Sequence, residues 1–152
     1  MMDQHIRVRT DDKYGRLYND LKNVAVGDFH ELFFVCACLG YQQAQARPLT
    51  GSGEARFWSS TIEPREWTCY YAMVLAENGM DYEAIQDDKA VLSCVEQYAN
   101  GGMEILLEAF LSEHTTEQGG QLQLAAAGSK ELSRDLLHFL YERTDPQAVG
   151  GQ

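Results

Sequence analysis

The sequence predicts an all-α protein, a compact bundle of about six helices to which a minor two-stranded β-ribbon can be added. Three observations support this fold class. The 152 residues are 45% hydrophobic, which is enough for one domain with a buried core. Apolar residues recur at the helical spacing i, i+3, i+4 in several separate segments. One of these segments, 28–49, is the most apolar stretch of an acidic chain, and we expect the rest of the chain to cover it.

A central helix is predicted to begin at Asp28. Asp28 and Glu31 have the spacing of a capping box, in which the first side chain accepts from a first-turn amide and the second reaches back. Apolar side chains occupy almost every face of the following residues up to Gly40, which can end the helix. At about 12 residues this helix is far shorter than the roughly 20 that cross a bilayer. We therefore expect a core helix that is buried all round.

On either side of this central helix, the N-terminal half of the sequence is predicted to form an arm, a helix and a loop. Residues 1–10 alternate apolar and basic side chains, which indicates an extended arm or an edge strand. A helix is expected to follow from Asp11 or Asp12. Its apolar stripe is formed by Tyr14, Leu17, Tyr18 and Leu21. Residues 41–60 predict a long loop, from which Phe57 and Trp58 either dock on the core or contact a partner.

The C-terminal half predicts several further helices within one helical domain, residues 11–145. In order, we expect a helix over 60–78 with Pro64 in its first turn, a short helical turn over 81–86, and helices over 87–100, 103–111 and 129–145. Asn100-Gly101-Gly102 is predicted to break the chain between two of them, because glycine allows a left-handed backbone. Residues 112–128 predict a mobile loop, with a strand over 121–125 that can pair with 6–10. Residues 146–152 predict a disordered tail.

The net charge of -11 is unevenly distributed. Residues 1–65 contain eight Lys or Arg and eight Asp or Glu, whereas residues 66–152 contain four against fifteen. An acidic surface repels nucleic acid backbones and favours a basic protein partner, although a solvated acidic surface that aids solubility is the simpler explanation. No signal peptide and no apolar run of membrane-spanning length is evident, so we expect a cytoplasmic protein without membrane association.

The residue spacings do not indicate catalysis, and we expect no enzyme activity, no catalytic residues, no cofactor and no metal. The four cysteines form no Cys-x-x-Cys pair, and the four histidines lack the ligand spacings of zinc sites. His30 is the one candidate acid or base, with a capping-region histidine as the alternative. Asp87-Asp88-Lys89 superficially resembles the clustered carboxylates of a metal-dependent nuclease, but it also suits a helix N-terminus.

Two motifs resemble a known family. They are Phe-Val-Cys-Ala-Cys-Leu-Gly-Tyr-Gln-Gln at 34–43, followed by Arg-Pro-Leu at 47–49, and Gln-Tyr-Ala-Asn-Gly-Gly-Met-Glu-Ile-Leu at 97–106. Together they are similar to the small DNA phosphorothioation (Dnd) system-associated proteins, which bacteria encode beside DNA sulfur modification and restriction genes. The resemblance implies antiphage defence as the setting and no particular reaction. Members usually carry a basic segment before Pro-Leu, where this chain has Gln42, Gln43, Gln45 and only Arg47.

Together these observations predict a non-catalytic accessory or adaptor subunit of a bacterial antiphage defence complex. Its expected partner is a larger helicase- or nuclease-type subunit, contacted through Asp87, Asp88, Glu96, Glu104 and Glu108. One alternative is a nucleic-acid-binding module that uses Arg7, Arg9, Lys13, Arg16 and Arg47. Another is an acidic inhibitor or DNA mimic that binds a basic nuclease through the same carboxylates.

Overall fold

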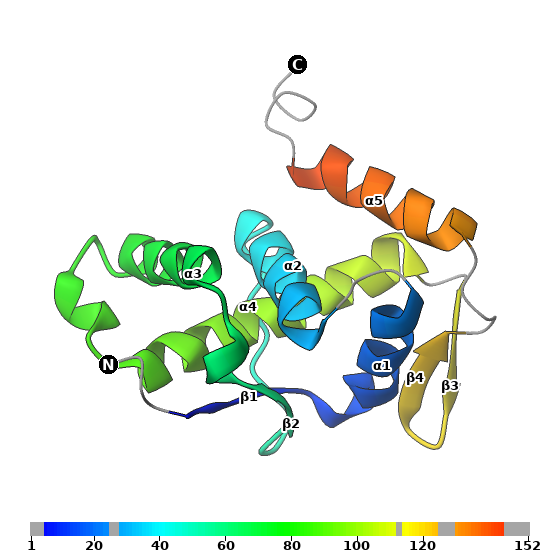
Figure 1. Ribbon diagram of the computed structural model, residues 1–152, viewed down its shortest axis with the longest axis horizontal. Coiled ribbons are helices and arrows are strands. Elements are labelled where there is room, and N and C mark those ends of the chain that lie inside the picture. The colour runs from blue at the N-terminus through cyan, green and yellow to red at the C-terminus, as the bar shows by residue number, and fades with distance from the viewer. Residues whose placement is uncertain (1–4, 25–27, 112–113, 125–129, 145–152) are drawn as a thin grey trace.

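The computed structural model describes residues 5–24, 28–111, 114–124 and 130–144 (Figure 1). The helices within them are α1 (Gly15–Val24), α2 (Phe29–Gln42), α3 (Pro64–Glu77), α4 (Asp88–Ala109) and α5 (Lys130–Thr144). The strands are β1 (Arg7–Thr10), β2 (Glu54–Trp58), β3 (Thr115–Gln118) and β4 (Gln121–Leu124), and the 3-10 helices are η1 (Asp12–Tyr14), η2 (Ser59–Thr61) and η3 (Tyr82–Ile85). The mostly helical prediction is confirmed, with five α-helices in the described residues in place of about six. The predicted tail, 146–152, lies outside them.

α2 and α4 cross at the centre of the molecule, and their buried faces form the middle of a core to which β1, α1, α3 and α5 also contribute (Figure 1). The crossing is close because glycines lie on both sides of it. A Cβ on Gly40 would overlap the carbonyl oxygen of Tyr98, and a Cβ on Gly102 would overlap the carbonyl oxygen of Cys36. α4 accordingly runs unbroken through residues 100–102, so the predicted break between two helices is wrong. These glycines let two helix backbones touch and do not turn the chain.

The capping box at the start of α2 is confirmed, since Asp28 and Glu31 make both of its reciprocal contacts. α2 does not end at Gly40 but continues to Gln42. One face is buried in the core, including Cys36, whereas Cys38 on another face is half-buried. The prediction of a helix buried all round is therefore wrong on one side, which faces α3.

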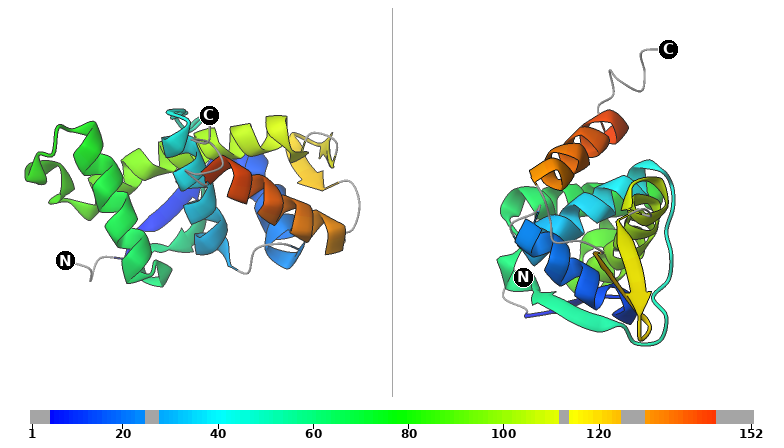
Figure 2. Two further views of the ribbon diagram at one scale, coloured as in Figure 1. Left: turned by 90° about the horizontal axis from the view of Figure 1, so that it is seen from above. Right: turned by 90° about the vertical axis from the view of Figure 1, so that its right-hand side faces the viewer.

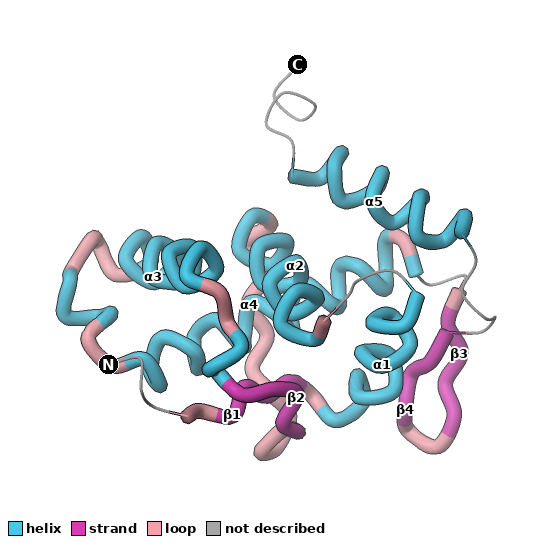
Figure 3. The backbone as a smooth tube through the Cα atoms, in the orientation of Figure 1, coloured by secondary structure: helices cyan, strands magenta, loops and turns pink. Residues whose placement is uncertain are grey.

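The two small sheets confirm the expected ribbon but not its pairing. β1 pairs antiparallel with β2, in a segment predicted to be a loop, and β4 pairs with β3 instead of with β1. Gly119 and Gly120 have positive φ angles of 59° and 80°, which suit the tight turn between β3 and β4. Figure 3 shows the β3–β4 hairpin beside α1, away from the β1–β2 sheet.

α2 and α3 run side by side in the same direction over α4 (Figure 2). Their N-terminal ends touch through His30 and Glu66, and the C-terminal halves of both line one groove. Pro64 opens α3, as predicted, and the Phe57 ring packs on Phe33 with centroids 5.3 Å apart. None of the helices in the described residues is long and apolar enough to span a membrane.

Candidate functional site

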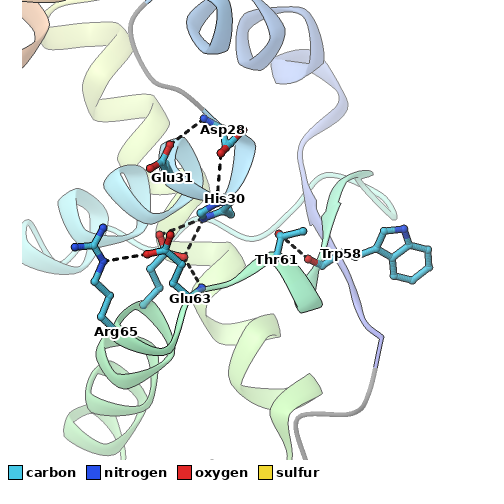
Figure 4. Close-up of polar contacts among 8 residues, drawn as sticks. Asp28, His30, Glu31, Trp58, Thr61, Glu63 and Arg65 are labelled. Atoms are coloured by element: carbon cyan, nitrogen blue, oxygen red, sulfur yellow. Dashed lines mark hydrogen bonds and ion pairs between the residues drawn. The ribbon is translucent and has the colours of Figure 1, made fainter.

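The N-terminal ends of α2 and α3 each carry a capping box (Figure 4). In α2 the Asp28 amide donates to Glu31 Oε1 at 3.0 Å, and in α3 the Glu63 amide donates to Glu66 Oε1 at 3.0 Å. The second box was not predicted, because Glu is not among the residues preferred at the N-cap. Glu63 and Glu66 nevertheless have the required spacing, so the sequence contained the signal.

His30 connects the two capping boxes (Figure 4). Its Nδ1 lies 3.0 Å from Glu66 Oε1 and 3.3 Å from Glu66 Oε2, and its Nε2 lies 3.7 Å from Asp28 Oδ2. The Glu66 side chain is only 3% exposed, which makes an unpaired carboxylate there very costly. It is stabilised by His30, by the Glu63 amide and by the partial positive charge at the helix N-termini. Because carboxylates face both imidazole nitrogens, the geometry favours the capping-region histidine over an acid or base catalyst.

Three of the cysteine thiols, those of Cys36, Cys38 and Cys94, are poorly placed to act as nucleophiles. Burial raises the pKa of both Cys36 and Cys38 to about 12, and it also raises the pKa of Cys94. A thiol with such a pKa carries almost no thiolate at neutral pH, and the thiolate is the reactive form. Among the described residues, no three His, Cys, Asp or Glu side chains are grouped in a way that could hold a metal ion.

The five predicted nucleic-acid contacts come from several segments, and the Arg9 and Arg47 amides bond to the neighbouring α4 residues Glu96 and Gln97. Arg7, Arg9, Lys13 and Arg16 follow one another along β1, η1 and α1, whereas Arg47 lies against α4. Several are already engaged within the chain. Two lie against aromatic rings: the Arg7 guanidinium is 4.5 Å from the ring centroid of Trp58, and the Lys13 ammonium is 5.3 Å from that of Tyr14. Two form ion pairs: Arg16 with Asp20 at 3.9 Å, and Arg47 with Glu104 at 2.9 Å.

Sequence reasoning assigned no role to Arg56, which has a structural one. Its side chain is 7% exposed and donates to Thr10 Oγ1 at 2.7 Å and to the Asp11 carbonyl at 2.8 Å. It also lies 5.4 Å from the ring centroid of Tyr18. Arg56 therefore ties β2 to the end of β1 and to α1, and a single arginine in an expected loop carried no signal for this.

The five predicted partner contacts are spread along α4. Asp87 caps the helix by accepting from the Lys89 amide, and Asp88 accepts from the Tyr71 hydroxyl at 2.8 Å. Glu96 and Glu104 are occupied by the Arg9 amide at 2.9 Å and by Gln45 and Arg47. Glu108 is exposed near the far end of the helix. Asp87 and Asp88 thus lie about 30 Å from Glu108, given 1.5 Å of rise per helical residue.

Residues 77–88, which we call the acidic tip, join the end of α3 to the start of α4 through η3. They contain five carboxylates and no Lys, Arg or His. Met80 is 62% exposed and Tyr82 is 68% exposed. Met80 also has a positive φ of 64°, an uncommon conformation for a residue other than glycine. Sequence reasoning missed Met80 and Tyr82, although two large apolar residues in an acidic turn were visible in the sequence.

Comparisons of the chain with protein-family models, with curated proteins and with solved structures each found no match. The two sequence motifs, 34–49 and 97–106, lie together in the fold. They meet where α2 crosses α4, and the Arg47 amide donates to the Gln97 carbonyl at 2.9 Å. This position explains the glycines of both motifs by close helix packing and assigns neither motif a reaction.

Proposed function

We propose that this chain is a non-catalytic adaptor subunit that binds a basic protein partner through its acidic tip. One observation carries the proposal: Met80 and Tyr82 stand exposed among five carboxylates. Large exposed apolar side chains in a charged rim are typical of protein interfaces, in which tyrosine and methionine are enriched. The carboxylates would speed encounter with a positively charged partner and discriminate against acidic ones.

The same observations disfavour the nucleic-acid alternative. The tip has no cation, and four of the five candidate cations lie against the chain's own aromatic rings or carboxylates. Binding to phosphates would have to displace several of these contacts. Duplex retention that falls steeply with salt would support nucleic-acid binding, and absence of retention at low salt would end it.

The proposed setting is antiphage defence, with a larger helicase- or nuclease-type partner. This part of the proposal depends on the resemblance of residues 34–49 and 97–106 to the Dnd-associated proteins. An acidic inhibitor or DNA mimic would use the same tip, so the two versions differ in their effect on the partner. An adaptor leaves the activity of a bound nuclease intact or raises it, whereas an inhibitor lowers it.

The test is co-expression of the tagged chain with the products of its neighbouring genes, followed by light scattering on the purified species. We expect a stoichiometric complex that weakens as salt is raised. The double variant Met80→Ser/Tyr82→Ser should lose the complex. The matched control is Leu137→Ser/Tyr141→Ser, which removes two residues of α5 that are 69% and 62% exposed but lie away from the tip. A monomer for the unmodified chain, or equal binding by both double variants, would contradict the proposal.

A further inference from the structure

A groove of about 740 Å³ lies between the C-terminal halves of α2 and α3. α2 contributes Cys38 and Tyr41, and α3 contributes Cys69, Met73 and Glu77. It lies at the opposite end of the helix pair from the contact between His30 and Glu66. Glu77 belongs both to the groove and to the acidic tip, so the two form one continuous surface.

The walls of the groove are apolar and its charge is negative. The Met73 thioether and the Ala72 methyl group offer no charge, and burial keeps the Cys38 thiol protonated by raising its pKa to about 12. Of the residues that line the groove, Glu77 is the only one of the types Asp, Glu, Lys, Arg and His. Burial and a hydrogen bond with Glu77 raise the pKa of the Tyr98 phenol, which places the Glu77 carboxylate beside the Tyr98 side chain.

Two helix C-termini strengthen the negative potential of the groove. α2 ends at Gln42 and α3 ends at Glu77, and neither helix has a Lys, Arg or His in its last turn. A helix C-terminus carries a partial negative charge, which a basic side chain in the last turn often neutralises. Here that neutralising cation is missing from the last turn of both helices, and α3 has a carboxylate, Glu77, in its place.

We propose that the groove receives an arginine side chain from a basic segment of the partner, an inference that rests on the proposed function. The apolar walls would contact the methylene groups of the arginine, and its guanidinium would form paired hydrogen bonds with Glu77. A planar guanidinium can also stack on the exposed part of Tyr41, which lysine cannot do equally well. The arginine anchors the partner, while Met80 and Tyr82 contact the surface around it.

The inference can be tested without the partner, by nuclear magnetic resonance on the ¹⁵N-labelled full chain. The probe is the tripeptide acetyl-Gly-Arg-Gly-amide, and its matched control has citrulline, a neutral isostere, in place of arginine. We expect saturable amide shifts within 38–44 and 69–77 for the arginine peptide only. Glu77→Gln should weaken binding about tenfold, since it replaces a charge-assisted hydrogen bond by a neutral one. Ala72→Trp should fill the groove and abolish binding, whereas Ala109→Trp, on exposed α4 surface, should bind normally.

Equal shifts with the citrulline peptide, or unchanged binding by Glu77→Gln, would overturn the inference. The co-expression experiment separates its failure from that of the proposed function. If the Ala72→Trp variant forms the complex equally well, the groove does not bind the partner, and the proposed adaptor function still stands. Binding of the arginine peptide by a chain that forms no complex would refute the adaptor and leave the cation-binding chemistry of the groove.

Discussion

The two ends of the α2–α3 pair differ in whether side chains of the protein neutralise the partial charge of the helix ends. At the N-terminal ends, the partial positive charge of both helices is met by carboxylates of the chain itself, with Glu66 buried between them. At the C-terminal ends, the partial negative charge meets no cation in the last turn of either helix. We call the N-terminal end, where His30 and Glu66 meet, the closed end, because its helix charges are neutralised within the chain. We call the C-terminal end, with the groove and the acidic tip, the open end.

This difference indicates which end is structural and which is available for binding. The contact between His30 and Glu66 uses its polar groups to hold two helices together. The groove and the tip leave apolar side chains exposed beside negative charge, and exposed apolar side chains gathered in one place mark an interaction site. Substitutions at the α2–α4 crossing should affect both ends, whereas a substitution at one end should affect that end alone.

The largest effect should come from the α2–α4 crossing, on which both ends depend. Gly102→Ala should lower the free energy of unfolding by about 4 kcal/mol, because its Cβ would overlap the Cys36 carbonyl. The control is Gly79→Ala, where a Cβ has open space and only the left-handed backbone is strained, at about 1 kcal/mol. Chemical denaturation measures both. Similar losses for the two variants would show that the helices do not cross so closely.

The next effect should come from the closed end. Glu66→Ala removes the partner of His30 and of the Glu63 amide and should cost about 2 to 3 kcal/mol. Glu31→Ala removes the equivalent glutamate of the α2 capping box, which has no histidine partner among its hydrogen bonds, and should cost about 0.5 to 1 kcal/mol. Both variants should still bind the arginine tripeptide. Equal destabilisation would mean that the bridge to His30 contributes nothing.

Glu96 can be compared with Glu66, because it is a partly buried carboxylate in the middle of a helix. Burial raises the pKa of Glu96 from its ordinary value of 4.5 to about 7, against the smaller lowering effect of Arg9. The folded state then binds the proton more tightly than the unfolded state. The contribution of Glu96 to stability is therefore fully present below pH 4.5 and is lost as the pH rises through 7.

Glu96→Gln should accordingly be more stable than the unmodified chain at pH 8, by about 2 kcal/mol after allowance for partial exposure, and the gain should vanish near pH 4. The glutamine oxygen can still accept from the Arg9 amide. Glu108→Gln, on the exposed side of the same helix, serves as the control and should change little at either pH. A stability difference that does not depend on pH would contradict the raised pKa.

The smallest effect on stability is expected at the open end. Met80→Gly should raise the free energy of unfolding by about 0.5 kcal/mol, because glycine adopts the positive φ angle without strain. It should also weaken the partner complex by removing an exposed apolar side chain. The control is Leu137→Ser, which removes an exposed apolar side chain of α5 away from both the tip and the groove and should leave the complex unchanged. If Met80→Gly kept full partner binding, the tip would not be the interface.

The helices were predictable from sequence wherever the signal was local. The Asp28 capping box, Pro64 at the start of α3 and the caps at Asp81 and Asp87 all depend on neighbouring residues. The break at 100–102 was predicted wrongly because its glycines make room for backbone that is distant in the sequence: Gly101 for the Gln45 carbonyl and Gly102 for the Cys36 carbonyl. Strand pairing failed for the same reason, since nothing local indicates that β1 pairs with β2.

The candidate site was harder to predict from the sequence than the helices were. The predicted carboxylates Glu96 and Glu104 are occupied by groups from distant segments, Arg9 and Arg47. Glu77 becomes notable only when α2 and α3 lie in parallel, which no periodicity reveals. The exposure of Met80 and Tyr82 is likewise a property of the folded turn.

The most direct test of the account is amide hydrogen exchange on the chain, alone and in complex with its co-purified partner. We predict new protection over 77–88 and along the groove, 38–44 and 69–77, with no change at the closed end, 28–33 and 63–66. Protection confined to β1, η1 and α1 would contradict the account and would direct attention to Arg7, Arg9, Lys13 and Arg16 as the binding surface.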